Sequence, residues 1–527
     1  MVKRKFVVLM LALALAGTLL LSGCGSSDSS KGSGEDTAAA GDQTAAEEVK
    51  DGHINAALYW FGTSLDPATE YDGWTTNRAG LTETLVTVDK NYEIQPLLAD
   101  SWEQKDDKTW VFHIRDGVTF HDGTPVDGAA VKAAFDRAME IQERAKDAAK
   151  IESIEADGQN VTFVTTEPFG AFLANISEPM YSIIKVGDDQ DYANAPIATG
   201  PFKVTGFKVN EEIDTERYDD YWNGASPVKT MKISCIEEDS TRGMALQSGE
   251  QDVVQRVANA DLPTFQSDPD YQVVDTTGAR VRIIIPNMQN EFLKDANVRK
   301  AIADSIDYDS LVSILGEGVT NAQAPYPKSA PYGYDDLEKQ DYNPEEAAEL
   351  LEESGYTDSD GNGYVDKDGK ELKLTLTYQM SDYTAMLEAV QAMAKESGIN
   401  IELKLTDSIE TVEEKKDFDL ICTNWQVLST GDPQWFLDTL YKTGAQNNCI
   451  SYSNKDLDAI IDKLTTAFDQ KNRQDLTIEA EKILLDDTAT IYLLGEKNFV
   501  VANNKVQNIT PYPIDYYFID NGMGISK

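Results

Sequence analysis

Residues 98–139 read LADSWEQKDDKTWVFHIRDGVTFHDGTPVDGAAVKAAFDRAM, and this block decides the fold. Trp110, Phe112 and Ile114 alternate with less apolar residues, which is the period of two that predicts a β-strand with one buried face. A Gly- and Pro-containing turn follows, and Asp127 stands where a helix N-cap is expected. The block therefore predicts two strands joined by a hairpin, then a tight turn and a helix.

Strand and helix patterns both recur along the rest of the chain. ELKLTLTY at 371–378 repeats the period of two, whereas KDLDAIIDKLTTAF at 455–468 spaces its apolar residues along one helical face. NPEEAAELLEESG at 343–355 opens with Asn343 as a predicted N-cap and ends at Gly355. The sequence therefore predicts a mixed α/β protein.

The N-terminal end has the layout of an export signal. Basic residues 3–5 precede an apolar run, 6–21, that is shorter than the ~20 residues a bilayer-spanning helix needs. The run ends in Leu-Ser-Gly followed by Cys24, which resembles the lipobox of bacterial lipoproteins, where the cysteine sulfur receives a diacylglyceryl group. We expect a signal peptide at 1–23 and lipidation of Cys24; a plain signal peptide with a chance cysteine is the alternative.

A tether follows the predicted lipidation site. Residues 24–50 contain no aromatic residue and almost no large apolar residue, so this stretch is expected to be disordered. The expected location is extracytoplasmic, with the protein lipid-anchored to the outer face of the bacterial cell membrane.

Composition excludes some classes of partner. A length of 527 residues predicts about three domains at ~100–200 residues each. The formal net charge of −45 repels phosphate backbones, so nucleic acid is not an expected partner. Beyond Cys24 three cysteines remain, which permit one disulfide at most. Cys422 and Cys449 can pair, or both can be buried thiols.

No catalytic signature stands out in the sequence. The chain has no G-x-S-x-G, H-E-x-x-H or G-x-x-x-x-G-K motif. The three histidines, His53, His113 and His121, lie far in sequence from any candidate nucleophile. We therefore expect a binding protein and not an enzyme, with an exported hydrolase as the distant alternative.

Five blocks together carry a family resemblance. The block at 98–139 is followed in order by similar blocks at 198–224, 297–312, 342–356 and 424–441. Their order and spacing resemble the peptide/nickel-type solute-binding proteins of ABC importers. This resemblance implies a two-lobed periplasmic-binding-protein-like α/β fold with an extra inserted subdomain and with the ligand enclosed between the lobes.

The resemblance also implies how the chain is divided and what it works with. Lobe 1 is discontinuous and carries the inserted subdomain, whereas lobe 2 is continuous and is reached by two crossing segments that act as a hinge. The implied ranges are 51–90, 195–280 and 497–527 for lobe 1, 91–194 for the subdomain, 281–496 for lobe 2, and about 275–282 and 494–500 for the crossings. The implied protein is a monomer that binds a short peptide and docks on membrane permease subunits of an ABC importer.

The segment NWQVLSTGDPQWFL supplies the first ligand candidates. In dipeptide- and oligopeptide-binding relatives, an aspartate before the proline of this block holds the α-amino group of the ligand, and Asp432 matches that position. Trp425 and Trp435 are expected to form rigid walls of the site. Alternatively, Asp432 caps the helix that begins near Gln434.

A metal chelate is the alternative cargo. Dipeptide-binding relatives place an arginine for the ligand carboxylate after the strand that corresponds to 371–378, and this sequence has none there. The stretches 77–85 and 140–163 are closer to the nickel-binding group. In that interpretation Arg78 and Arg144 hold carboxylates of a small metallophore, because a guanidinium group can bind a carboxylate through two hydrogen bonds. Alternatively, both arginines form ordinary surface or helix ion pairs.

An acidic loop resembles part of a calcium site. The spacing D-x-D-x-N-G-x-x-D matches the start of an EF-hand loop, although Gly369 stands where the glutamate of position twelve belongs. No cofactor is expected apart from a structural calcium here, and a solvated turn is the alternative. The candidate ligands are Asp358, Asp360, Asn362 and Asp366.

Overall fold

The computed structural model describes residues 50–379, 383–445 and 448–526, all within one compact unit, Ala46–Lys527. The predicted signal peptide 1–23, Cys24 and the tether up to residue 49 lie outside the described residues. Within the described parts of the chain, no helix has the length and apolar character needed to cross a bilayer.

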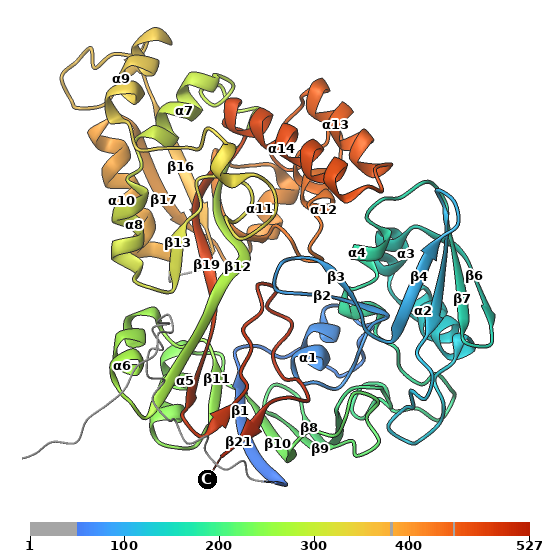
Figure 1. The fold of residues 1–527 in the computed structure, drawn as a ribbon. Helices are drawn as coiled ribbons and strands as arrows, with labels where there is room; N and C mark the ends of the chain where they lie inside the picture. The colour runs from blue at the N-terminus through green and yellow to red at the C-terminus, as the bar shows by residue number, and fades with distance from the viewer. Residues whose placement is uncertain (1–49, 380–382, 446–447, 527) are drawn as a thin grey trace, which may run out of the picture. The chain divides into compact units, whose positions relative to one another are not determined.

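One large mixed sheet joins the two lobes, and it contains eleven strands in the described residues (Figure 1). From one edge to the other, its strands are β8 (Phe202–Lys208), β9 (Glu212–Arg217), β10 (Val228–Cys235), β1 (Gly52–Leu58), β11 (Val253–Gln255), β19 (Ile491–Asn503), β12 (Tyr271–Pro286), β18 (Leu420–Gln426), β16 (Lys373–Tyr378) and β17 (Asn400–Leu405), with β13 (Val319–Asn321) paired to β19.

Two long antiparallel strands, β12 and β19, run through the middle of this sheet and connect its two ends (Figure 1). One part of β19 pairs with β11 of the first lobe, whereas Arg280 to Pro286 of β12 pair with β18 of the second lobe. The register of the pair shifts between Thr277 and Val281. Gly278 permits this irregularity, because a Cβ there would lie 2.7 Å from the carbonyl oxygen of Glu496.

The inserted subdomain is built on a second sheet of four antiparallel strands, in the order β4-β5-β7-β6. Asp127 begins its longest helix by accepting a hydrogen bond from the Ala130 N–H at 2.9 Å, as the sequence predicts. The elements are β4 (Ala99–Gln104), β5 (Thr109–Ile114), β6 (Ile151–Asp157), β7 (Asn160–Thr165), α2 (Gly128–Ile141), α3 (Glu143–Ala149) and α4 (Phe172–Asn175).

Most of the remaining helices belong to the second lobe. These are α7 (Ala296–Asp304), α8 (Tyr308–Leu315), α9 (Pro344–Glu353), α10 (Thr384–Glu396), α11 (Ile409–Lys415), α12 (Gln434–Leu440), α13 (Lys455–Thr465) and α14 (Gln470–Asp486). The first lobe contributes α1 (Asp72–Arg78), α5 (Asp239–Gln247) and α6 (Leu262–Ser267). Three short pairs complete the fold: β2 (Val86–Val88) with β3 (Ile94–Pro96), β14 (Asp366–Lys367) with β15 (Lys370–Glu371), and β20 (Val506–Gln507) with β21 (Gly524–Ile525).

The local elements that the sequence predicts are confirmed. Trp110, Phe112 and Ile114 are buried on one face of β5, and the alternating leucines around β16 are fully buried. Asn343 caps α9 through the Glu346 N–H, and the apolar stripe of α13 faces a core. Separate hydrophobic clusters fill the inserted subdomain, the first lobe and the second lobe. The residue boundaries of the lobes stay a prediction.

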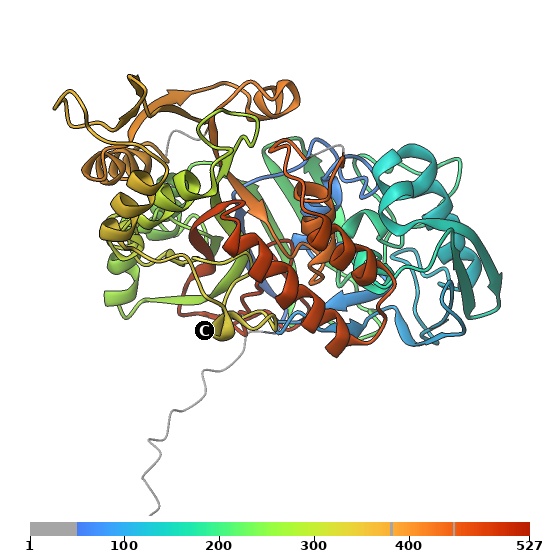
Figure 2. The same cartoon turned by 90° about the horizontal axis from the view of Figure 1, so that it is seen from above.

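The inserted subdomain also contacts the second lobe directly. The Gly170 N–H donates to the carbonyl oxygen of Thr465 at 2.7 Å, and Phe468 packs against Trp110 in the subdomain core. A Cβ on Gly170 would lie 2.1 Å from the Ala467 carbonyl oxygen, so only glycine permits this approach. Figure 2 shows α13 and α14 lying beside the subdomain, and Figure 1 agrees.

No disulfide bond links Cys422 to Cys449. Cys422 and Cys449 are buried in two different hydrophobic clusters, and Cys449 carries a free thiol. The alternative of a disulfide between them is therefore wrong for this structure. Packing, and not a covalent bond, holds the two clusters.

Glu83 gives the fold a testable pH dependence. The Glu83 side chain is buried and accepts hydrogen bonds from the Tyr221 hydroxyl at 2.7 Å and the Trp222 indole N–H at 3.2 Å. Burial raises the pKa of Glu83 from 4.5 to about 7 despite these donors. A raised carboxyl pKa stabilises the folded state below pH 4.5, and this contribution is lost as the pH rises through 7.

We therefore predict that Glu83→Gln flattens the pH dependence of stability. The free energy of unfolding, measured by urea denaturation, should fall between pH 5 and pH 8 by about 2–3 kcal/mol less in Glu83→Gln than in the wild type. Glu353→Gln, at an exposed position of α9, is the control and should keep the wild-type profile. Equal profiles for Glu83→Gln and the wild type would rule out a raised pKa at Glu83.

Candidate functional site

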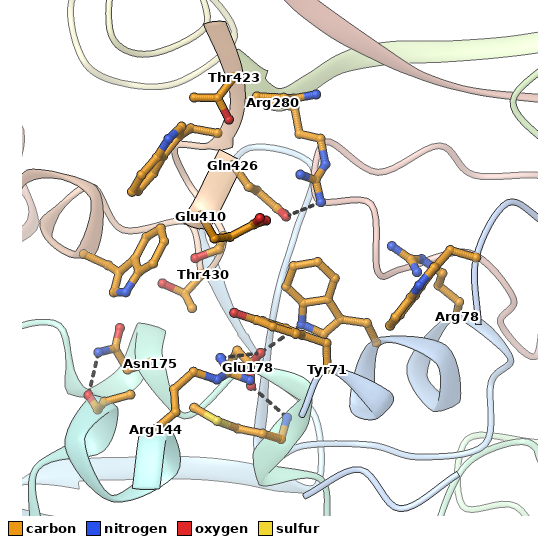
Figure 3. Close-up of a pocket in the computed structure, with 18 of the residues that line it drawn as sticks. Tyr71, Arg78, Arg144, Asn175, Glu178, Arg280, Glu410, Thr423, Gln426 and Thr430 are labelled. Carbon is orange, nitrogen blue, oxygen red and sulfur yellow. Dashed lines mark hydrogen bonds and ion pairs between the residues drawn. The ribbon is translucent and has the colours of Figure 1, made fainter. Parts of the chain in front are cut away.

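A cavity of about 540 Å³ lies where the first lobe, the inserted subdomain and the second lobe meet. Its walls come from the end of β1, α1, the segment around α4, the middle of β12, α11 and the segment that joins β18 to α12. Figure 3 shows the polar side chains of these elements converging on one space. The volume is in the range of sites for small molecules.

Aromatic side chains form much of the cavity wall. Trp425 and Trp435, both predicted site residues, line it with their ring centroids 5.6 Å apart. Trp435 is 43% exposed, which is unusual for a tryptophan. The other aromatic lining residues, from the first lobe, are Tyr59, Trp60, Tyr71 and Trp74.

Arg78 lines the cavity, as predicted, at the end of α1. Its Nε donates to the Asp515 carbonyl oxygen at 2.7 Å and its Nη2 donates to the Tyr59 hydroxyl at 2.7 Å. Its Nη1 is buried and has no hydrogen-bond partner among the described residues. A buried guanidinium nitrogen without a hydrogen-bond partner is energetically costly.

Arg144 also lines the cavity, in the inserted subdomain. Its Nη1 donates to Glu178 at 3.2 Å, and its guanidinium carbon lies 4.6 Å from the centroid of the Tyr71 ring. Trp74 donates to the same Glu178 oxygen at 2.9 Å. Arg144 is therefore held in an ion pair, and its side chain is 36% exposed, which leaves it accessible.

Arg280, on β12, is a cavity residue that the sequence analysis missed. Its Nε donates to Asp515 at 2.9 Å and its Nη2 donates to Gln426 at 3.1 Å. Burial alone would raise the pKa of Asp515, but Arg280, Arg78 and Arg256 hold it well below its usual range. The sequence does carry a signal for it: Arg280 and Arg282 alternate with apolar residues in the otherwise apolar stretch ARVRIIIP, which is unusual for a buried strand.

Two glutamates of α11, also missed, line the cavity. Glu410 and Glu413 are three residues apart, which places them on one helix face. Burial, followed by the charge of Glu410, raises the pKa of Glu413 to about 7. No sequence signal separates these two residues from acids on any solvated helix.

Three polar atoms of the β18–α12 segment are buried and unmatched. They are Asn424 Oδ1, Gln426 Nε2 and Thr430 Oγ1, none of which has a hydrogen-bond partner among the described residues. The two amide groups are oriented by their other ends, because Asn424 donates to Glu496 at 2.7 Å and Gln426 accepts from Arg280. Two cavity-lining residues of one strand thus carry a buried unpaired acceptor and a buried unpaired donor, two residues apart.

The structure indicates a different role for Asp432 from the predicted one. Asp432 is not among the lining residues; its carboxylate pairs with Arg473, with Nη2 2.7 Å from each oxygen and Nε 2.9 Å from one. It also accepts from the Gln434 N–H at 2.9 Å, as the helix-cap alternative predicts. Asp432 therefore has the contacts of a structural residue in this structure, and its ligand role stays a prediction.

The acidic loop at 358–366 uses its carboxylates on its own backbone. Asp358 accepts from the Gly361 and Gly363 N–H groups at 2.8 and 3.0 Å, and Asp366 accepts from Ser359. No group of three or more His, Cys, Asp or Glu side chains in the described residues is arranged to hold a metal ion. Calcium binding by Asp358, Asp360, Asn362 and Asp366 stays a prediction, and the geometry is that of a solvated turn.

Comparisons with known proteins agree on one family. Residues 93–448 match the family described as bacterial extracellular solute-binding proteins, family 5 Middle. The nickel-binding protein NikA of Staphylococcus aureus is 25% identical over 515 residues, which cover 97% of this chain and 98% of that protein. The probable D,D-dipeptide-binding periplasmic protein DdpA of Escherichia coli is 27% identical over 468 residues, or 84% of this chain and 88% of that protein.

A solved structure shows the same fold. The crystal structure of the nickel ABC transporter from Bacillus halodurans matches with a TM-score of 0.79 and 32% identity, over 90% of this chain and all of that chain. The two-lobed architecture is therefore that of a known fold.

The pairing of Asp432 with Arg473 yields a second prediction. Asp432→Asn should lower the free energy of unfolding in urea by about 3 kcal/mol, because it leaves a buried guanidinium without its counter-charge. Affinity for any compound bound in the cavity should change less than threefold. Asp462→Asn removes an exposed ion pair to Lys442 and should cost less than about 1 kcal/mol. Tenfold weaker binding with unchanged stability would restore the ligand role of Asp432.

Proposed function

Because the chain belongs to family 5 of the bacterial extracellular solute-binding proteins, we propose that it captures short peptides outside the cell and delivers them to an ABC importer. Members of this family are transport receptors and not enzymes, and they work outside the cytoplasm. The peptide ligand, the docking on permease subunits and the membrane anchor are the parts of the proposal that go beyond family membership.

The observation that carries the peptide proposal is the pair of unmatched amide atoms on β18. A peptide unit offers one N–H donor and one C=O acceptor, which complements Asn424 Oδ1 and Gln426 Nε2. A polycarboxylate chelate offers only acceptors and would leave Asn424 Oδ1 unmatched. The aromatic walls supply rigid apolar surface for side chains of variable identity.

The arginines support a carboxylate on the ligand. Arg280 and Arg78 share the single carboxylate of Asp515, so the basic side of the cavity holds more cationic than anionic groups. This supplies the anion-binding position that the sequence lacks after residues 371–378. A free peptide carboxylate fits that excess, since guanidinium groups bind carboxylates with paired hydrogen bonds.

A metal chelate is the second candidate. NikA of Staphylococcus aureus and the nickel ABC transporter of Bacillus halodurans are among the relatives, and Arg144 is accessible at the cavity wall. A small carboxylate-bearing chelate would bring its own metal ligands and use Arg78 and Arg144 as predicted from the sequence.

Ligand capture is proposed to close the two lobes about β12 and β19. The irregular pairing near Gly278 lies within the crossing segments 275–282 and 494–500, which supports a hinge there. In this division residues 281–496 move as lobe 2, and the inserted subdomain 91–194 moves with lobe 1.

We predict that short peptides stabilise the protein. Native mass spectrometry of the purified body should detect co-purified peptide, and a di- to pentapeptide mixture should raise the melting temperature, since a ligand at 100 times its Kd stabilises the native state by about 2.7 kcal/mol. A nickel–histidine chelate should not. Stabilisation by the chelate alone would select the second candidate, and hydrolysis of the peptides would indicate an enzyme.

Two alanine variants, one of a cavity residue and one of a residue outside the cavity, test where the peptide binds. Trp435→Ala should reduce the thermal shift because Trp435 lines the cavity. Tyr342→Ala removes an aromatic side chain with the same 43% exposure, outside the cavity, and should leave the shift unchanged. Equal shifts in both variants would place the bound peptide elsewhere.

Lipid anchoring through Cys24 is proposed on the sequence alone. We predict that Cys24→Ala moves the exported protein from the membrane fraction to the medium or periplasm and abolishes incorporation of labelled palmitate. Cavity binding should be unchanged, because Cys24 precedes the compact unit. Retention of the variant on the membrane would exclude the lipid anchor.

A further inference from the structure

Two carboxylates in the cavity have no counter-charge. Glu410 and Glu413 lie on the same face of α11, and no ion pair to either forms within the described residues. The Ser408 hydroxyl donates to Glu410 at 3.0 Å, which positions its carboxylate without neutralising it. The arginines of the cavity are already engaged, Arg144 by Glu178 and Arg280 by Asp515.

Both glutamates line the cavity, where Glu413 is half-buried and Glu410 is exposed. Thr430 and Gln426 line the same cavity, are only 5% and 7% exposed, and have buried polar atoms without partners. In the view of Figure 3 the side chain of Glu410 extends into the cavity between them. Burial raises the pKa of Glu413 to about 7, which a solvated glutamate would not show.

Two tryptophans complete this end of the cavity. Trp425 and Trp435 line the same cavity as the glutamates, with ring planes 35° apart. Aromatic faces attract cations through the ring quadrupole, by about 0.5–2 kcal/mol according to exposure. Carboxylates and indole rings together are therefore suited to a cationic group.

We propose that Glu410 and Glu413, with Trp425 and Trp435, form a subsite for an organic cation of the ligand, either a terminal ammonium or a basic side chain. This proposal rests on the proposed function and adds a specificity to it. The preferred cargo carries a cationic nitrogen that the α11 glutamates bind and an anionic or acceptor group that Arg280 binds. In this proposal Glu410 and Glu413 have the role that the family resemblance assigns to Asp432.

The test compares charged and neutralised ligands by calorimetry. The probes are trialanine, N-acetyl-trialanine and N-acetyl-lysyl-dialanine, and the variant is Glu410→Gln with Glu413→Gln. We expect the double variant to weaken binding of a cation-bearing probe at least tenfold and to change binding of N-acetyl-trialanine less than threefold. Loss of trialanine binding identifies a terminal ammonium, and loss confined to the lysyl probe identifies a basic side chain.

A matched control excludes a general effect of charge. Glu349→Gln with Glu352→Gln makes the same change at the same helical spacing on exposed positions of α9 and should leave every affinity unchanged. Circular dichroism of each variant checks folding. Equal weakening of all three probes in the cavity variant, or no weakening, would overturn the subsite.

A non-peptide probe separates this proposal from the proposed function. Benzylammonium binding is followed by saturation-transfer NMR in the wild type and the cavity variant. If no peptide binds but benzylammonium does, and the double variant abolishes it, the peptide proposal fails and the subsite stands. If peptides bind and the variant leaves both benzylammonium and the cationic peptides unaffected, the subsite fails and the peptide proposal stands.

Discussion

A carboxylate buried without a counter-charge destabilises a protein by several kcal/mol, and the two buried carboxylates at the meeting point of the lobes, Asp515 and Glu496, are both paired with arginines. Asp515 accepts from Tyr59 and Arg280, and its backbone carbonyl accepts from Arg78. Glu496, on β19, accepts from Arg282 on β12 and from Asn424 on β18. These bonds fix the end of β1, the start of lobe 2 and both crossing strands against one another.

The groups bonded to Asp515 and Glu496 also supply charged and polar side chains to the cavity wall. Arg78 and Arg280, which line the cavity, are both held by Asp515, and Arg280 donates to the side-chain oxygen of Gln426, another lining residue. The groups that hold the lobes together are thus the same groups that give the basic end of the cavity its character. Any motion of the lobes has to keep these hydrogen bonds or replace them. Ligand binding in the cavity and motion at the hinge therefore involve the same side chains.

Among the residues that the structure describes, the inserted subdomain and the second lobe are joined without an ion pair at the contact beside α13. The Gly170–Thr465 hydrogen bond and the Phe468–Trp110 contact join the inserted subdomain to α13, and Asp432 supports them through Arg473, which also donates to the Leu464 and Ala467 carbonyl oxygens. Asp432 thus lies in the predicted ligand segment but contacts Arg473 and does not line the cavity. Residues 424–435 contain both cavity residues and structural residues, and sequence position does not separate them.

The sequence by itself determined the local elements, the α/β class, the family resemblance and four of the cavity residues, Arg78, Arg144, Trp425 and Trp435. Periodicity and caps depend on neighbours within one element, so they can be read from the chain. Only the tertiary structure decided that Arg280, Glu410 and Glu413 line the cavity and that Asp432 does not. The partners of a charged side chain are set by segments that lie far apart in sequence, as Asp432 with Arg473 and Arg78 with Asp515 show, and no local pattern carries that information.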